Sequence, residues 1–169
     1  MKIQKPAQLV AIEALTIYDN VPDLLAKWYA LSGDVTAKSY LKWQKYNSSP
    51  NPSATHGNRF VNNYTNSIAN KYGRIASGEY LHPDSVIAKD NLRVTTRSDV
   101  FAGSLFIMEK LAAGKSPKSK DWLYKIIMPD SSFFGDTLGD NADKVSFCHE
   151  CHSTELIDDY LFFMPKEYR

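Results

Sequence analysis

Cysteine, net charge and long apolar runs are all scarce in this sequence of 169 residues. It holds 2 cysteines, and its 20 Lys and Arg residues nearly balance its 19 Asp and Glu residues. A net charge of +1 gives no electrostatic case for binding nucleic acid or an anionic membrane. No apolar run approaches the roughly 20 residues that a membrane-spanning helix needs. We therefore expect a soluble chain without a transmembrane segment.

Both cysteines fall in one five-residue motif near the C-terminus, Cys148-His149-Glu150-Cys151-His152. C-x-x-C-H is the spacing at which two thiols bond covalently to the vinyl groups of haem while the adjacent histidine ligates the iron. No cysteine is left over for a disulfide framework. The motif therefore predicts one covalent haem c per chain, with His152 as a ligand of the metal.

Three other uses of the two cysteines are weaker. A structural zinc site needs two further ligands, and the remaining histidines, His56 and His82, sit in no metal-binding spacing. A thioredoxin-type C-x-x-C lies at the start of a helix that follows a strand. Residues 145–147, directly before Cys148, are too few to form that strand. A disulfide across two intervening residues closes too short a loop to stabilise the fold much.

The same motif bears on location, because haem is normally attached covalently outside the cytoplasm. We therefore expect a periplasmic protein. The first residues show no export signal, since Met1 to Gln4 lead into Pro6 without a sustained apolar segment. We expect that the signal is missing from this chain, or that its start is processed or renumbered.

The first part of the chain has a helical pattern. Apolar residues recur at helical spacing from Leu9, and Pro22 restarts the pattern with a proline in a first turn. A further helix is expected after Asp34. From 59 to 72 every fourth residue is apolar or aromatic, which favours another helix although four asparagines lower the propensity. We interpret residues 1–169 as one domain whose first 35 residues are a helical N-terminal extension.

After Gly78 the period changes to two. Residues 86–91 and 105–111 alternate in polarity, and residues 122–128 and 160–164 are apolar runs of strand length. Turn-rich segments separate these runs. The pattern predicts an α+β fold, a mostly antiparallel β-sheet preceded by N-terminal helices. Haem c would be attached near the C-terminus, on the connection between the last strands.

The second half of the chain resembles the cytochrome P-460 family, which includes the β-sheet cytochromes called c-prime-beta. The resemblance covers roughly residues 36–169 and depends on the order and spacing of a few segments. These are Gly78-Glu79-Tyr80 leading to Ser85-Val86-Ile87-Ala88-Lys89, Leu105-Phe106-Ile107-Met108-Glu109-Lys110, Asp121-Trp122-Leu123-Tyr124, the C-x-x-C-H motif, and Tyr160-Leu161-Phe162-Phe163.

The resemblance implies a homodimeric, mostly antiparallel β protein with a five-coordinate haem, on which His152 is the proximal ligand and the distal side is open. In relatives that oxidise hydroxylamine, a strand lysine is joined covalently to the porphyrin and a distal carboxylate moves protons. Lys89 and Glu109 stand at the matching places. The c-prime-beta relatives bind nitric oxide in an apolar distal pocket without such turnover. A small nitrogen-oxide ligand or substrate and a redox partner cytochrome are implied as well.

The place of Glu109 in an otherwise apolar strand separately indicates a functional carboxylate. It shares a face with Leu105 and Ile107, where an unpaired carboxylate is costly to bury and could shuttle protons to a bound ligand. Two ordinary alternatives are pairing with an arginine, such as Arg59 or Arg93, and a solvated face.

Several other side chains could complete such a site. Met108 is the rival ligand, but neighbours on a strand point to opposite faces, so Met108 and Glu109 cannot both face a haem without a bulge. Met128 and Met164 are weaker candidates, because methionine is usually a core residue. His56 could be a distal ligand or proton donor, although a lone loop histidine is usually exposed or hydrogen-bonded.

Lys89 lies in an apolar neighbourhood that could lower its pKa, whereas a strand lysine ordinarily extends to solvent. Trp122, Tyr124 and Phe162 are expected to pack against haem, because a large apolar ring needs such walls. The leading function is a haem enzyme that oxidises hydroxylamine or otherwise processes nitrogen oxides at a five-coordinate haem. The alternatives are a nitric-oxide-binding cytochrome without turnover and an electron-transfer haem subunit of a larger complex.

Overall fold

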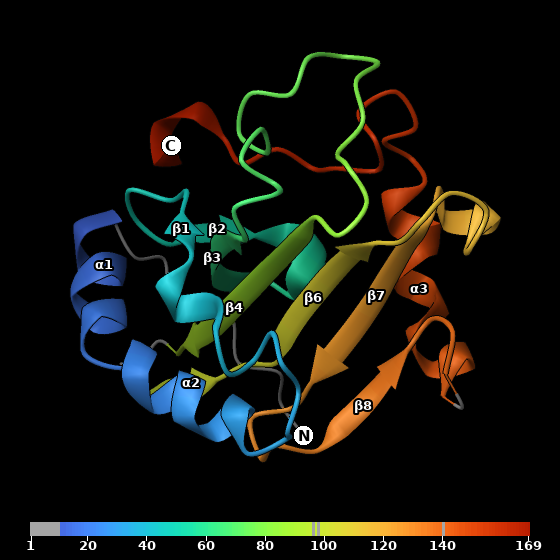
Figure 1. The fold of residues 1–169 in the computed structure, drawn as a ribbon. Helices are drawn as coiled ribbons and strands as arrows, with labels where there is room; N and C mark the ends of the chain where they lie inside the picture. Colours follow the sequence, from blue (N-terminus) through green and yellow to red (C-terminus); the bar gives the residue numbers. More distant parts are fainter. Residues whose placement is uncertain (1–10, 96, 98, 140) are drawn as a thin grey trace.

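The computed structural model of this chain describes residues 11–95, 97, 99–139 and 141–169 (Figure 1). Its helices and strands are α1 (Ala11–Asp19), α2 (Pro22–Ala30), β1 (Gln44–Lys45), β2 (Asn51–Ser53), β3 (Arg59–Thr65), β4 (Val86–Val94), β5 (Val100–Ala102), β6 (Leu105–Lys110), β7 (Trp122–Ile127), β8 (Phe133–Asp136) and α3 (Ala142–His152). Short 3-10 helices are η1 (Tyr40–Lys42), η2 (Ala54–His56), η3 (Pro117–Ser119) and η4 (Lys166–Tyr168). The predicted α+β class is confirmed.

The strands form one antiparallel sheet in the order β1-β3-β4-β6-β7-β8, with β2 beside β3 and β5 beside β4. Met108 on β6 lies opposite Ile87 on β4 and Tyr124 on β7. Because side chains directly opposite one another share a face, these three residues mark one face of the sheet. Ala88 and Ile107, also opposite each other, mark the other face.

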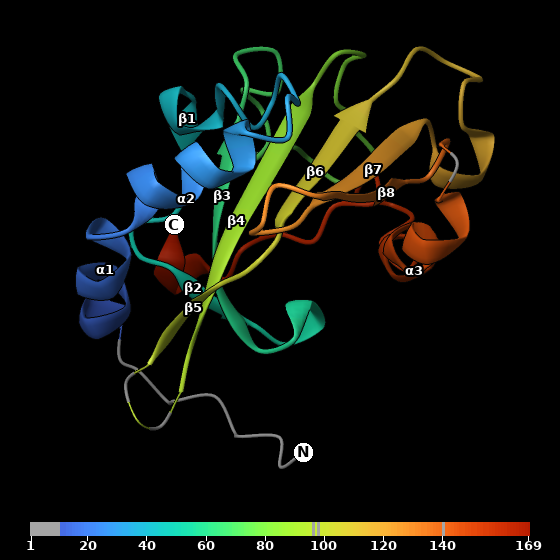
Figure 2. The ribbon, with the colours of Figure 1, turned by 90° about the horizontal axis from the view of Figure 1, so that it is seen from below.

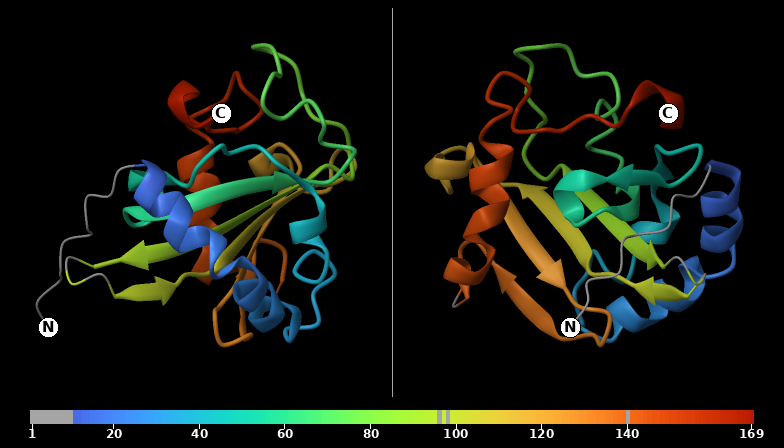
Figure 3. Two further views of the ribbon diagram at one scale, coloured as in Figure 1. Left: turned by 90° about the vertical axis from the view of Figure 1, so that its left-hand side faces the viewer. Right: turned by 180° about the vertical axis from the view of Figure 1, so that it is seen from behind.

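The two faces are covered by different parts of the chain (Figure 2). Helices α1 and α2 lie over the face of Ala88, here called the helix face, where Leu25 and Tyr29 of α2 pack into the core. Helix α3, the segment 66–85 and the C-terminal segment lie on the side of Met108, here called the loop face (Figure 3). The helix face is therefore closed by regular secondary structure, and the loop face by irregular chain and one helix.

Helices α1 and α2 form where the sequence predicts helix, within residues 1–35. Pro22 occupies the first turn of α2, where its missing N–H leaves no hydrogen bond broken. Leu25 and Tyr29, four residues apart, are the buried residues of α2 and lie on the face that packs onto the sheet. Leu9 and residues 1–4 lie outside the described residues. Within the described residues, no helix is both long and apolar enough to cross a bilayer.

Three local predictions were wrong. Residues 59–65 form strand β3 rather than a helix, and turns follow it. Beyond Asp34 the chain forms turns, the single 3-10 turn η1 and strand β1. Residues 160–164 form no strand, since Tyr160 has a positive φ of 62° and the segment packs against the loop face instead of pairing with the sheet.

Candidate functional site

The C-x-x-C-H motif lies in the second half of α3. Cys148, Cys151 and His152 are at positions i, i+3 and i+4, so they share one side of the helix. Both cysteines are free thiols, and burial raises the pKa of the Cys148 thiol to about 12. The motif therefore sits on a helix, and not on a connection between two strands as the sequence pattern predicts.

His152, at the end of α3, is buried and firmly oriented. Its Nδ1 lies 2.7 Å from the carbonyl oxygen of Tyr160. A carbonyl only accepts hydrogen bonds, so Nδ1 carries the proton and Nε2 keeps its lone pair. Burial lowers the pKa of His152 to about 4, against the opposing effect of this hydrogen bond. The rings of Tyr124 and Phe162 flank the imidazole at centroid distances of 5.1 and 5.2 Å.

A pocket adjoins this histidine on the loop face. The space enclosed within it is about 70 Å³, and its mouth is open to solvent. Its lining is mainly apolar and comes from the sheet, α3 and the C-terminal segment. Its apolar and aromatic members include Ile87, Phe106, Met108, Tyr124, Leu161 and Phe162. Cys148, Cys151 and His152 line the same pocket.

Lys89 of β4 also lines the pocket. It lies on the loop face, and within the described chain none of the ion pairs involves it. Burial lowers the pKa of Lys89 to about 8, because a charged ammonium is poorly solvated there. An appreciable fraction of the side chain is then a neutral amine near pH 7.5.

Glu109 does not occupy the expected position. It is absent from the pocket lining, and its Oε2 lies 3.1 Å from Nζ of Lys125, which also pairs with Asp34 at 3.5 Å. The side chain of Glu109 remains 31% exposed. The adjacent Met108 faces the pocket instead, as the alternation of a strand requires. Glu109 is therefore not among the residues that line the pocket, although Lys125, its partner, is one of them. The partner of Glu109 is a lysine rather than an arginine.

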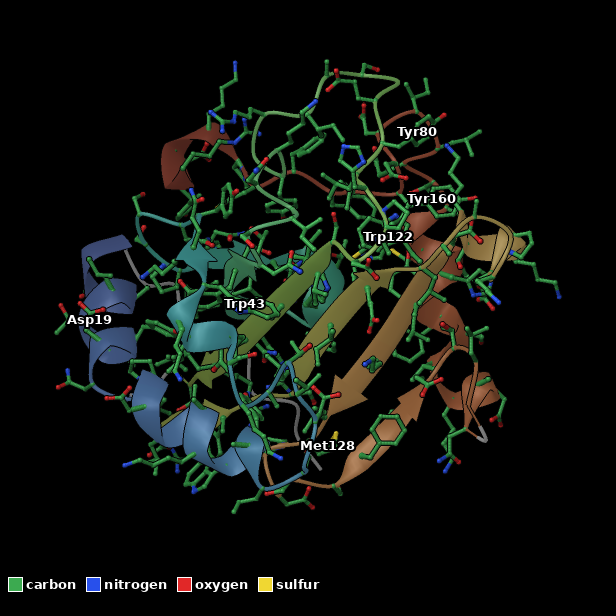
Figure 4. All side chains as sticks on the ribbon, in the orientation of Figure 1. Asp19, Trp43, Tyr80, Trp122, Met128 and Tyr160 are labelled. Carbon is green, nitrogen blue, oxygen red and sulfur yellow. The ribbon has the colours of Figure 1, made fainter. Side chains whose placement is uncertain are left out.

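The three aromatic residues that were expected to pack against haem divide into two groups. Tyr124 and Phe162 line the pocket. Trp122 is fully buried behind it, and its Nε1–H donates to the carbonyl oxygen of Asp159 at 2.7 Å. Figure 4 labels Trp122 and Tyr160, which belong to the same buried cluster at this end of β7.

His56 is a pocket residue that sequence reasoning set aside. It ends the short helix η2, its ring lies 5.1 Å from that of Phe106, and burial lowers its pKa to about 2. Its Nδ1 lies 2.8 Å from Oγ of Ser53 and 3.1 Å from Oγ1 of Thr55. No pattern in the sequence indicates this position, because it depends on β2 and β3 pairing beside β4. Of the methionines considered, only Met108 lines the pocket.

The residues present fit a large apolar ring with one metal-binding histidine. The pocket combines two thiols, an imidazole with a free Nε2 and apolar walls. The buried hydroxyl of Tyr124 has no hydrogen-bond partner among the described residues, so it is free for a bound group. In that part of the chain no three His, Cys, Asp or Glu side chains are grouped to hold a bare metal ion. The chain matches no protein-family model, and no curated protein matches it either.

Proposed function

We propose that this protein is a periplasmic mono-haem cytochrome of the c type, similar to the cytochrome P-460 family, whose pocket takes a small nitrogen-oxide ligand. The observation that carries the proposal is the setting of His152. It ends a C-x-x-C-H motif, lies in an apolar pocket, and has its Nδ1–H bonded to the Tyr160 carbonyl so that Nε2 is available. Cys148 and Cys151 would hold the haem through thioether bonds.

The pocket residues have separate tasks in this proposal. Haem bound here would supply an iron with an open position for a small ligand. Phe106, Met108 and Leu161 exclude water from that position by their apolar side chains. Tyr124 and Phe162 hold the ring of His152 from two sides, which fixes its rotation.

Binding of nitric oxide is the function that the geometry supports best. An uncharged diatomic ligand suits an apolar pocket and needs no proton acceptor for binding. The resemblance to hydroxylamine-oxidising relatives implies a distal carboxylate at Glu109, but this side chain lies outside the pocket and pairs with Lys125. A nitric-oxide-binding cytochrome is therefore favoured over an enzyme that depends on Glu109.

Oxidation of hydroxylamine is the second candidate, and two pocket residues favour it. His56 places a neutral imidazole among the residues that line the pocket, where it is a hydrogen-bond partner for a protic ligand such as hydroxylamine. Lys89 lines the pocket and has a lowered pKa, so it has the neutral amine expected of the lysine that the resemblance places in a cross-link to haem. In this variant of the proposal His56, rather than Glu109, contacts the bound substrate.

The deciding experiment is visible spectroscopy of the holoprotein, produced in cells that attach haem c, in the ferric and ferrous states with and without nitric oxide. Covalent haem with broad high-spin bands that respond to nitric oxide supports the proposal. A ferrous Soret band shifted far to the red indicates the Lys89 cross-link, and turnover of added hydroxylamine then favours the enzyme. Sharp low-spin bands indicate ligation by Met108 and an electron carrier. Absence of covalent haem overturns the proposal.

The resemblance extends the proposal to two kinds of protein partner. One is a second copy of this chain in a homodimer, which size-exclusion chromatography with light scattering tests directly. The other is a redox partner cytochrome, which would exchange electrons with the haem. Covalent attachment outside the cytoplasm is the reason for proposing a periplasmic location.

A further inference from the structure

The carbonyl group that orients His152 belongs to an unusual stretch of backbone. Asp159 and Tyr160 both have left-handed φ angles, 55° and 62°, in succession. Aspartate tolerates this region, but a bulky aromatic residue rarely adopts it. Such a conformation persists only where surrounding contacts hold it in place, and it occurs often at functional sites. The contacts that hold this stretch therefore control where the Tyr160 carbonyl points.

Those contacts converge on Asp159, which is fully buried. Its carboxylate accepts from Nζ of Lys110 at 2.6 Å and from the backbone N–H of Leu81 at 2.9 Å. Its carbonyl oxygen accepts the indole N–H of Trp122 at 2.7 Å. Lys110 ends β6, Trp122 begins β7 and Leu81 precedes β4. One residue of the loop after α3 is thereby fixed to three parts of the scaffold.

We propose that Asp159, through its ion pair with Lys110, is a positioning residue for the axial ligand His152. Asp159 holds the backbone so that the next residue, Tyr160, presents its carbonyl to Nδ1 of the imidazole. That hydrogen bond keeps the proton on Nδ1, fixes the ring and makes Nε2 a stronger donor to iron. The inference rests on the proposed function, because the ligand it orients is the proximal ligand of haem.

The test uses the haem-loaded protein and three variants. Asp159→Asn removes the charge that pairs with Lys110, and Trp122→Phe removes one hydrogen bond to Asp159 while keeping an aromatic ring. Asp158→Asn removes the same charge one residue earlier and is the matched control. We expect both test variants to lower the ferrous iron–histidine stretching frequency and to shift the reduction potential upwards, Asp159→Asn more strongly. The control should leave both values as in the unchanged protein.

A second readout does not depend on haem. In the haem-free protein, the ¹⁵N chemical shifts of His152 should report the single Nδ1–H tautomer, and in Asp159→Asn a mixture of both tautomers. If Asp159→Asn loses stability but keeps the tautomer, the stretching frequency and the potential, its role is structural only and the inference is overturned. If Asp159→Asn does not fold, the same three measurements on Trp122→Phe decide between the two roles. Absence of covalent haem overturns the proposed function alone, because the tautomer still reports on the positioning.

Discussion

Two adjacent residues of β4 show how differently the two faces of the sheet use a buried polar side chain. Asp90 points to the helix face and accepts hydrogen bonds from Tyr18 at 2.5 Å, Tyr40 at 3.1 Å and Asn62 at 3.4 Å. Lys89 points to the loop face and has no ion-pair partner among the described residues. At these two positions the helix face uses its polar group to hold the fold together, and the loop face leaves its polar group available.

This difference indicates on which face a ligand can bind without breaking existing hydrogen bonds. On the helix face the buried carboxylate and its tyrosines already satisfy one another, so a ligand would have to break existing hydrogen bonds. On the loop face the Tyr124 hydroxyl lacks a partner in the described structure, and His152 presents an unused Nε2. Substitutions on the two faces should therefore separate, with ligand effects on the loop face and stability effects on the helix face.

The largest effect is expected from removing both thiols. Cys148→Ala combined with Cys151→Ala should abolish covalent haem, because no other cysteine is present. Haem staining of a denaturing gel measures the loss directly. Far-UV circular dichroism should stay close to that of the unchanged haem-free protein, since the core of the helix face contains neither cysteine. Covalent haem that persisted in the double variant would contradict the site.

The next effect should appear in the stability of the helix face. Burial raises the pKa of Asp90 to about 6, against about 4 for an ordinary aspartate. Between these values the folded state binds a proton that the unfolded state has released. The free energy of unfolding should therefore fall as pH rises from about 4 to about 6, by up to roughly 3 kcal/mol.

Urea unfolding at several pH values between about 4 and 6 measures how steeply the free energy of unfolding falls with pH. Asp90→Asn should flatten this slope, while Asp19→Asn, at an exposed position, should leave it unchanged. Affinity for nitric oxide should not follow this slope, because Asp90 faces away from the pocket. A slope that survives Asp90→Asn would assign the titration to another group.

Strands β4, β6 and β7 could be predicted from the sequence, whereas β3 and the short strands β1, β2, β5 and β8 could not. Period-two alternation marks β4 and β6, and an apolar run marks β7. Strand β3 was mistaken for a helix because Phe60 and Tyr64, four residues apart, are also an even number apart and share a face of a strand. Asn62 and Asn63 concealed the strand further. Both can be buried because they form hydrogen bonds with residues that are distant in the sequence: Asn62 donates to Asp90, and Asn63 donates to Asn47.

The site could be predicted only where local spacing determines it. The motif places Cys148 and His152 together on any helix, so these residues were found. The face of Glu109 could not be deduced, because both faces of the sheet are apolar and covered and either could hold a cofactor. His56 was missed because the pairing of distant strands brings it to the pocket. The apolar segment from Tyr160 to Met164 was misread as a strand because it is buried by packing alone.

A smaller effect should come from His56, which lines the pocket. His56→Phe removes the imidazole while keeping an aromatic ring beside Phe106. If the protein processes hydroxylamine, turnover should fall by at least about tenfold, because the bound substrate loses a hydrogen-bond partner that positions it. Nitric oxide affinity, which needs no proton transfer, should change by less than about twofold. Equal losses for both ligands would mean that His56 shapes the pocket without a specific hydrogen bond to hydroxylamine.

The smallest effect should come from Glu109, and it tests the contrast between the faces most sharply. Glu109→Gln removes an ion pair with Lys125. Because the side chain of Glu109 is 31% exposed, the free energy of unfolding should fall by only about 0.5 kcal/mol. Because the side chain lies outside the pocket, ligand affinity and any hydroxylamine turnover should stay within about twofold. The matched control is Asp34→Asn, which removes the other carboxylate that pairs with Lys125. A large loss of turnover in Glu109→Gln but not in Asp34→Asn would return the carboxylate to the reaction, and would mean that the pocket draws protons through the sheet from the helix face.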